Sequence, residues 1–128
     1  MKTIIAGSRD ITDWISIHAI LHEVGRMGEF TEVVSGLARG PDMIGKQWAE
    51  ACEIRVKGFR PAWQNPDGTT DKGMKRNALM AAYADRAVIF WDGKSKGTKN
   101  MIDQAFKEQI ETHVYFLQPE VLSSTLQA

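Results

Sequence analysis

The chain has 128 residues, of which 43% are hydrophobic and 25% are charged, and its acidic and basic residues balance to a formal net charge of zero. A chain of this length builds one domain around one core, and its composition excludes disordered and fibrous proteins as well as proteins that coat nucleic acid through an excess of basic residues. One cysteine excludes an internal disulfide, and the apolar stretches are too short to span a membrane, so we expect a cytoplasmic protein without a membrane partner.

Short apolar runs alternate with amphipathic stretches along the chain. In the first half of the chain they predict a strand at Lys2–Ala6, a helix capped by Thr12 or Asp13, a strand at Glu32–Ser35, a helix from Pro41 to about Cys52 and a strand at Ile54–Phe59. After a loop at 60–71, they predict a helix at Gly73–Tyr83, a strand at Ala87–Trp91, a helix at Gly97–Gln109 and a strand at His113–Leu117. This alternation indicates an α/β fold: a single Rossmann-like, doubly wound domain over residues 1–118, with about five parallel strands in the order 3-2-1-4-5 and helices on both faces. Residues 119–128 are expected to form a polar tail.

The helical periodicity also places apolar side chains against the predicted core. Trp14 lies on the first helix, and Met74, Leu79 and Phe106 lie on the later helices at positions that we expect to pack inward. Cys52 ends a helix among apolar residues, so it is expected to be a buried thiol rather than a nucleophile.

Three glycine-bearing turns each follow a predicted strand and precede a helix or its first turn. They are Ala-Gly-Ser-Arg-Asp at 6–10, Ser-Gly-Leu-Ala-Arg-Gly-Pro-Asp at 35–42 and Trp-Asp-Gly-Lys-Ser-Lys-Gly-Thr-Lys-Asn at 91–100. Each turn combines glycine with a hydroxyl side chain and a basic side chain, which are the groups that bind phosphate. The predicted strand order brings all three turns to the carboxyl edge of the sheet, so we expect one anion-binding rim around a single crevice.

Neither a cofactor nor a metal ion is expected. The first turn lacks Gly-x-Gly-x-x-Gly, and no turn has Gly-x-x-x-x-Gly-Lys-Ser/Thr, so neither a dinucleotide fingerprint nor an ATP-hydrolysing phosphate loop is supported. His18 and His22 are four residues apart on one helical face, but no third ligand is evident and the chain has no His-Glu-x-x-His motif.

Several residue types in and near the turns suit a phosphate-bearing ligand. Arginine side chains fork onto phosphate oxygens, and the hydroxyls of Ser8 and Thr98 either donate to the ligand or cap the following helix. Trp63 either stacks on a base or closes an edge of the core. The residues expected to bind the ligand are Gly7, Ser8, Arg9, Gly36, Arg39, Gly40, Asp42, Trp63, Arg76, Asn77, Asp92, Gly93, Ser95, Gly97 and Thr98.

These motifs resemble those of the SLOG superfamily, a Rossmann-like group that includes the Lonely Guy phosphoribohydrolases and the DNA-processing protein A core, and in particular its small YspA-like branch. The resemblance runs through the Gly-Ser-Arg-Asp turn, the Ser-Gly-x-Ala-Arg-Gly-x-Asp turn, the Trp63 loop, Arg-Asn-x-x-Met at 76–80 and Phe-Trp-Asp-Gly-x-Ser-x-Gly-Thr at 90–98. It implies a nucleotide or nucleotide-derived ligand. For some members it also implies cleavage of the N-glycosidic bond of nucleoside monophosphates.

One departure from the phosphoribohydrolases bears on catalysis. Their motif is Pro-Gly-Gly-x-Gly-Thr-x-x-Glu, and here Met101 stands where the glutamate would be. Cleavage of a glycosidic bond passes through a cation-like sugar and needs a carboxylate nearby. Arg76, Asp10 and Asp92 are the catalytic candidates, with Asp42 as a further possible acid, and the sequence selects none of them.

The leading hypothesis is therefore a sensor or sequestering module that binds a nucleotide or a nucleotide-derived ligand. The first alternative is an N-glycosidase or phosphoribohydrolase that acts on nucleoside 5′-monophosphates. The second is binding of single-stranded nucleic acid, which Trp63 beside Arg60 suggests and the neutral charge balance opposes. We also expect a homo-oligomer, because many doubly wound domains of this size associate through exposed helices.

Overall fold

The computed structural model describes residues 1–61 and 73–119, in which strands and helices alternate as the sequence predicts. The elements are β1 (Lys2–Gly7), α1 (Trp14–Met27), β2 (Glu32–Ser35), α2 (Pro41–Ala51), β3 (Arg55–Gly58), α3 (Met74–Tyr83), β4 (Arg86–Trp91), α4 (Lys96–Lys107) and β5 (Glu111–Phe116). Local chemistry sets several boundaries. The side chain of Asp13 accepts a hydrogen bond from the amide of Ser16 and caps α1, and Pro41 begins α2, where a helix does not need its amide donor.

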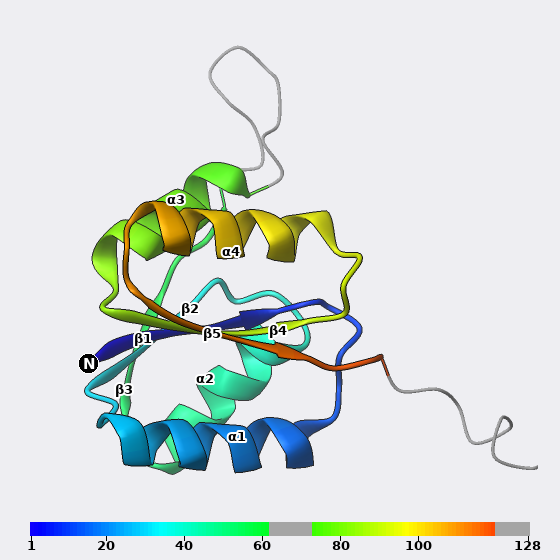
Figure 1. The fold of residues 1–128 in the computed structure, drawn as a ribbon. Coiled ribbons are helices and arrows are strands. Elements are labelled where there is room, and N and C mark those ends of the chain that lie inside the picture. The colour runs from blue at the N-terminus through cyan, green and yellow to red at the C-terminus, as the bar shows by residue number, and fades with distance from the viewer. Residues whose placement is uncertain (62–72, 120–128) are drawn as a thin grey trace, which may run out of the picture.

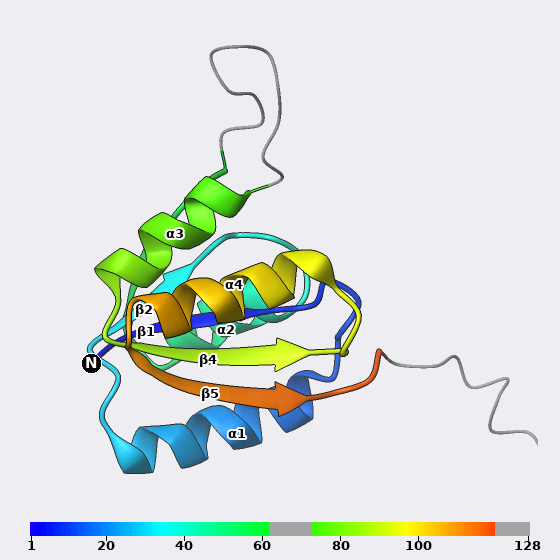
Figure 2. The ribbon, with the colours of Figure 1, turned by 45° about the horizontal axis from the view of Figure 1, so that its top comes forward.

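The five strands form one parallel sheet in the order β3-β2-β1-β4-β5, which confirms the predicted fold and strand order. Within it, Ile4 of β1 pairs with Val34 of β2 on one side and with Ala87 of β4 on the other. Figures 1 and 2 show α3 and α4 on one face of the sheet and α1 and α2 on the opposite face. The carboxyl ends of β1 and β4 therefore lie side by side, at the point where the chain turns to opposite faces.

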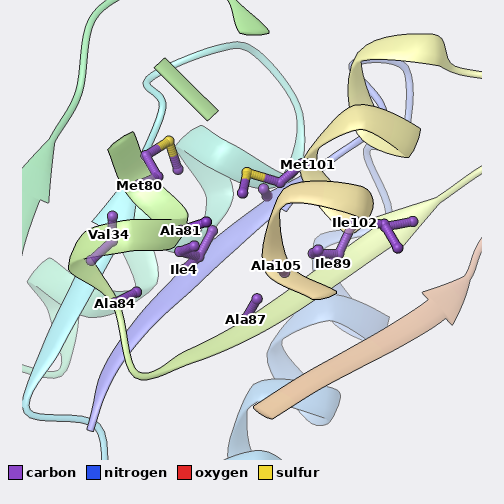
Figure 3. Packing of buried hydrophobic residues seen from close by; sticks show 11 residues of the cluster. Ile4, Val34, Met80, Ala81, Ala84, Ala87, Ile89, Met101, Ile102 and Ala105 are labelled. Atoms are coloured by element: carbon purple, nitrogen blue, oxygen red, sulfur yellow. The ribbon is translucent and has the colours of Figure 1, made fainter. Parts of the chain in front are cut away.

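Each face of the sheet carries its own hydrophobic cluster. Successive side chains of a strand point to opposite faces, so Ile4 packs under α3 and α4 whereas Ile5 packs under α1 and α2. The first cluster is drawn in Figure 3, where Met80 from α3 and Met101 from α4 approach Ile4 and Ile89 of the sheet. The central strands are buried on both sides, which explains why they form nearly continuous apolar runs in the sequence.

Five side chains that were expected in the core are exposed, and these predictions are wrong. The exposed fractions are 56% for Trp14, 51% for Met74, 60% for Leu79 and 61% for Phe106, and the Cys52 thiol is also exposed. Trp14 and Met74 are the first residues of their helices and precede the buried stripe by one turn, while Leu79 and Phe106 lie beside that stripe. Cys52 follows the last residue of α2, so the helix no longer holds it against the sheet.

Among the described residues, no helix combines the length and the apolar character that crossing a bilayer requires.

Candidate functional site

A cavity of about 640 Å³ opens at the carboxyl edge of the sheet. Its volume is typical of a site for a small molecule. All three glycine-bearing turns contribute to its lining, together with α3 and the start of α4. The described lining residues are Ala6, Gly7, Ser8, Arg9, Asp10, Ala38, Arg39, Asp42, Arg76, Asn77, Met80, Asp92, Lys94, Ser95, Gly97, Thr98 and Met101.

Most of the described residues that the sequence singles out line this cavity, and three of them do not. Gly36 lines a second, smaller cavity beside the first. Gly40 and Gly93 line neither of the two. Trp63 lies outside the described residues.

A chain of hydroxyl groups joins the first turn to the third. The Oγ of Ser8 lies 3.3 Å from the Oγ1 of Thr98, and the Oγ1 of Thr98 donates to the Oγ of Ser95 over 3.1 Å. The amide of Asp92 donates to the Oγ of Ser8 over 3.1 Å. Ser8 and Thr98 are both buried, so their hydroxyls hold β1 and α4 together at the wall of the cavity.

The N-terminus of α4 opens onto the same cavity. Ser95 is the N-cap, and its side chain accepts from the amide of Thr98. The amides of Lys96 and Gly97 donate to no acceptor within residues 1–61 and 73–119, because the first amides of a helix have no intrahelical partner. A Cβ on Gly97 would meet no atom within 4 Å. The packing of the described residues therefore does not require glycine at this position, and the backbone of the helix start is left uncovered.

The other turns contain glycines for reasons of packing. A Cβ on Gly7 would lie 2.4 Å from the carbonyl oxygen of Phe90, so only glycine lets β1 approach β4 this closely. Gly40 has a φ of +85°, and a Cβ there would lie 2.7 Å from the carbonyl oxygen of Arg9. These two glycines bring the first turn against its neighbours, whereas a Cβ on Gly97 would meet open space.

Asp42 is the most deeply buried charged residue of the cavity. Its Oδ1 accepts from the amide of Gly7 over 3.3 Å, and its Oδ2 accepts from the amide of Ala38 over 3.4 Å. Burial raises the pKa of Asp42 to about 6, although the positive charges of Arg76 and Arg9 and the two amide hydrogen bonds oppose this shift. The sequence predicts a ligand contact for Asp42, with an acid role as a further possibility, and the geometry adds a bridge between the first two turns.

Asp92 organises the third turn. Its Oδ1 accepts from the amides of Lys94 and Ser95, each over 2.8 Å. The hydrogen bond from Ser95 is the main reason why the pKa of Asp92 lies below its ordinary value. Asp92 is therefore ionised at neutral pH, and one of its oxygens is committed to the backbone of the loop.

The arginines of the cavity differ in their partners. Arg39 pairs with Asp10 at 2.9 Å, and both side chains are about 70% exposed. Arg76 donates through Nη1 to the carbonyl oxygen of Gly36 over 2.7 Å. Arg9 forms no hydrogen bond or ion pair with the described part of the chain, so its guanidinium is available to a ligand.

Asn77 fastens α3 to the start of α4. Its Oδ1 accepts from the Nε of Arg76 over 3.0 Å, and its Nδ2 donates to the carbonyl oxygen of Gly97 and to the Oδ1 of Asn100. The predicted pair of Arg76 and Asn77 thus reaches the cavity from the side of α3, and Asn77 also positions the helix end that Gly97 leaves open.

Two methionines form the apolar part of the cavity wall, and the sequence did not assign them this role. Met80 and Met101 are 1% and 2% exposed and line both the core and the cavity. Figure 3 shows them together at one end of the cluster. Ala6 and Ala38 complete the lining, and the signal that could have identified them is their place inside the first two turns.

In the described ranges, no group of three or more His, Cys, Asp and Glu side chains is arranged to hold a metal ion. His18 and His22 instead contact the ring edges of Trp14 and Trp48, with centroid distances of 5.4 and 5.8 Å.

Comparison with known proteins agrees with the motifs in the turns. The YAcAr family, described as the YspA, cpYpsA-related SLOG family, matches residues 1–65, which is about half of the chain and contains the first two turns. No curated protein and no solved structure gives a significant match. Because this match covers about half of the chain, the chain belongs to the YspA, cpYpsA-related SLOG family.

Proposed function

We propose that the protein binds a nucleotide or a nucleotide-derived ligand in the 640 Å³ cavity, with a phosphate group at the N-terminus of α4. The observation that carries the proposal is the open helix end at Gly97, where two amides have no acceptor in the described chain and no side chain fills the space. A helix N-terminus of this kind attracts anions through its amides and its partial positive charge.

The charges around the cavity support the same ligand. The described lining contains four basic residues and three acidic ones, and the acidic ones already have partners: Asp10 with Arg39, and Asp42 and Asp92 with backbone amides. The side chains of Arg9 and Lys94 form no hydrogen bond or ion pair with described residues. The ligand therefore meets two uncommitted positive charges, and a guanidinium can bind two phosphate oxygens at once.

The apolar wall supports an organic ligand rather than a bare phosphate ion. Met80 and Met101 lie on the side of the cavity that faces the core, opposite the charged rim. Methionine side chains adapt to flat and irregular partners, so this wall suits a sugar or a base. A nucleotide combines both chemistries in one molecule.

The partners of the carboxylates favour binding or sensing over cleavage of the N-glycosidic bond. Met101 supplies no acid, Asp10 is paired at the surface, and Asp92 holds its own loop. Asp42 is buried with both oxygens on amides. A glycosidase needs a carboxylate beside the reacting sugar; Asp10 and Asp42 would first have to leave their present partners, and Asp92 has one oxygen committed to its loop.

The proposal is tested by calorimetry with nucleoside 5′-monophosphates, 5′-diphosphates and cyclic phosphates on the full chain. At least one nucleotide is expected to bind, and Arg9→Gln is expected to weaken it by about tenfold or more, because a hydrogen-bonded ion pair is lost. Arg55→Gln is the matched control, since Arg55 is an exposed arginine of β3 that lines neither cavity. Equal binding by Arg9→Gln and the wild type would overturn the phosphate site.

The same samples separate the alternatives. Chromatography of nucleoside monophosphates after incubation with concentrated protein is expected to show no free base, and release of base would establish the N-glycosidase instead. Salt-dependent binding to single-stranded oligonucleotides, without binding to mononucleotides, would favour the nucleic-acid alternative.

A further inference from the structure

A second cavity of about 500 Å³ adjoins the first one. The two share Arg9, Ala38, Arg39 and Arg76 in their linings, so these residues form the boundary between them. Only the second cavity is also lined by Arg60. A single ligand can therefore contact both spaces without leaving the protein.

The second cavity differs from the first in its charge. Its described lining contains four arginines and no acidic residue, whereas the first cavity contains three aspartates. Like charges that face one space repel each other, and an anion between them removes that repulsion. Arg39 is partly compensated by Asp10, which lies at 2.9 Å.

Arg60 and Arg9 have no such direct ion pair in the described part of the chain. Neither side chain forms a hydrogen bond or an ion pair with residues 1–61 or 73–119. Arg9 lies at the boundary and Arg60 lies in the second cavity, so the positive charge continues from one space into the other. Guanidinium groups in this arrangement suit phosphate-type oxygens, which they bind in pairs.

We infer that the second cavity binds a second anionic group of the same ligand. The ligand is then a nucleotide that carries two phosphate-type groups, one at the N-terminus of α4 and the other at Arg60. This inference rests on the proposed function, because it presumes that the first cavity holds a nucleotide. It goes beyond that function by specifying the class of ligand and by making Arg60 the residue that distinguishes it from a monophosphate.

The test compares three forms of each common nucleoside by calorimetry on the full chain: the 5′-monophosphate, the 5′-diphosphate and the 3′,5′-bisphosphate. One of the two forms with a second anionic group is expected to bind the wild type about tenfold or more tightly than the monophosphate. The diphosphate gains affinity if the two groups are adjacent, and the bisphosphate gains affinity if they lie on either side of the sugar.

Arg60→Gln is expected to abolish this gain and to leave monophosphate binding unchanged, while Arg55→Gln leaves both unchanged. Thermal unfolding of each variant checks that the fold is intact. If the monophosphate binds and the second group adds nothing, or if Arg60→Gln weakens all three forms equally, the second site is wrong and the proposed function stands. If no form binds, the proposed function is wrong and this inference with it.

Discussion

The protein buries charged side chains near both ends of its central sheet, and two of them, Asp42 and Arg86, are held in different ways. Asp42 lies near the carboxyl edge and is 5% exposed, while Arg86 begins β4 at the amino edge and is fully buried. Asp42 lines the cavity, receives two amide hydrogen bonds and lies near the positive charges of Arg9 and Arg76. The charge of Asp42 therefore lies close enough to the cavity to interact with a ligand bound there.

Arg86 donates its hydrogen bonds to neutral groups, and the negative charge of Glu111, its register partner in β5, partly opposes the effect of burial on its pKa. Its Nε donates to the Oγ1 of Thr3 over 3.0 Å, its Nη1 donates to the carbonyl oxygen of Val24 over 3.4 Å, and its guanidinium lies 4.7 Å from the centre of the Phe30 ring. Its Nη2 has no hydrogen-bond partner among the described residues, and burial lowers the pKa of Arg86. Buried charges in one fold thus differ in surroundings: Asp42 lies at a cavity and is reached by other charges, whereas Arg86 is enclosed by residues of the core.

The largest expected effect is on stability at the amino edge. Arg86→Ala removes a large buried side chain and leaves Thr3 and Val24 without their donor, so we expect the free energy of unfolding to fall by about 3 kcal/mol. Urea unfolding measures this change. Arg86→Met keeps most of the volume and removes the charge, so its loss should be smaller. If Arg86→Ala kept its stability but lost nucleotide binding, the assignment of Arg86 to stability at the amino edge and of binding to the carboxyl edge would be wrong.

At the carboxyl edge, the raised pKa of Asp42 predicts a pH dependence. Its ordinary value is 3.8 and its folded value is about 6, so between these values the folded protein binds a proton more tightly than the unfolded chain. Raising the pH from 4.5 to 8 should therefore cost the wild type about 2 kcal/mol relative to Asp42→Asn.

The measurement is the difference in unfolding free energy between the wild type and Asp42→Asn across this pH range, because all other titrating groups are common to both. Parallel pH profiles for the two proteins would show that Asp42 keeps its ordinary pKa. Asp42 would then not be a buried charge with a shifted pKa, and it could not be compared with Arg86 in this way.

The smallest effect separates stability from binding at one glycine. Gly97→Ala adds a methyl group in open space within the first turn of α4, so the fold should gain about 0.5 kcal/mol while nucleotide binding weakens. Gly25→Ala is the matched control, because Gly25 lies inside α1, where a Cβ would make an ordinary contact of 3.6 Å with Phe30. Thermal unfolding and calorimetry on both variants give the two readouts, and unchanged binding by Gly97→Ala would contradict the open helix end.

The fold was predictable because its information is local. Buried parallel strands form apolar runs, and glycine turns mark where each run ends, so the strand order and the meeting of the three turns follow from the pattern alone. The burial of Arg86 was not predictable in this way. A charged residue at the start of an apolar run ordinarily marks a strand boundary, and Arg86 is buried because residues distant in the sequence enclose it. Likewise, the exposure of Leu79 depends on where α3 meets the sheet rather than on its own periodicity.

The roles within the site were harder to predict than its location. Asp42 accepts from Gly7, which is 35 positions away, and Ser8 contacts Thr98, which is 90 positions away. Such long-range hydrogen bonds leave no trace in local spacing. The sequence therefore identified most of the lining residues, but it could not separate those that hold the turns together from those, such as Arg9, that remain available to a ligand.

The contact between Ser8 and Thr98 has a consequence for folding. Two segments 90 positions apart in the chain meet in the wall of one cavity, so forming that cavity requires nearly the whole polypeptide to be in place. A fragment ending after the second turn would lack the α4 wall and its open helix end. A bound nucleotide would stabilise, by mass action, only a chain in which both segments have folded. Its measured affinity would therefore depend on the cooperative folding of the cavity as well as on the contacts with the ligand.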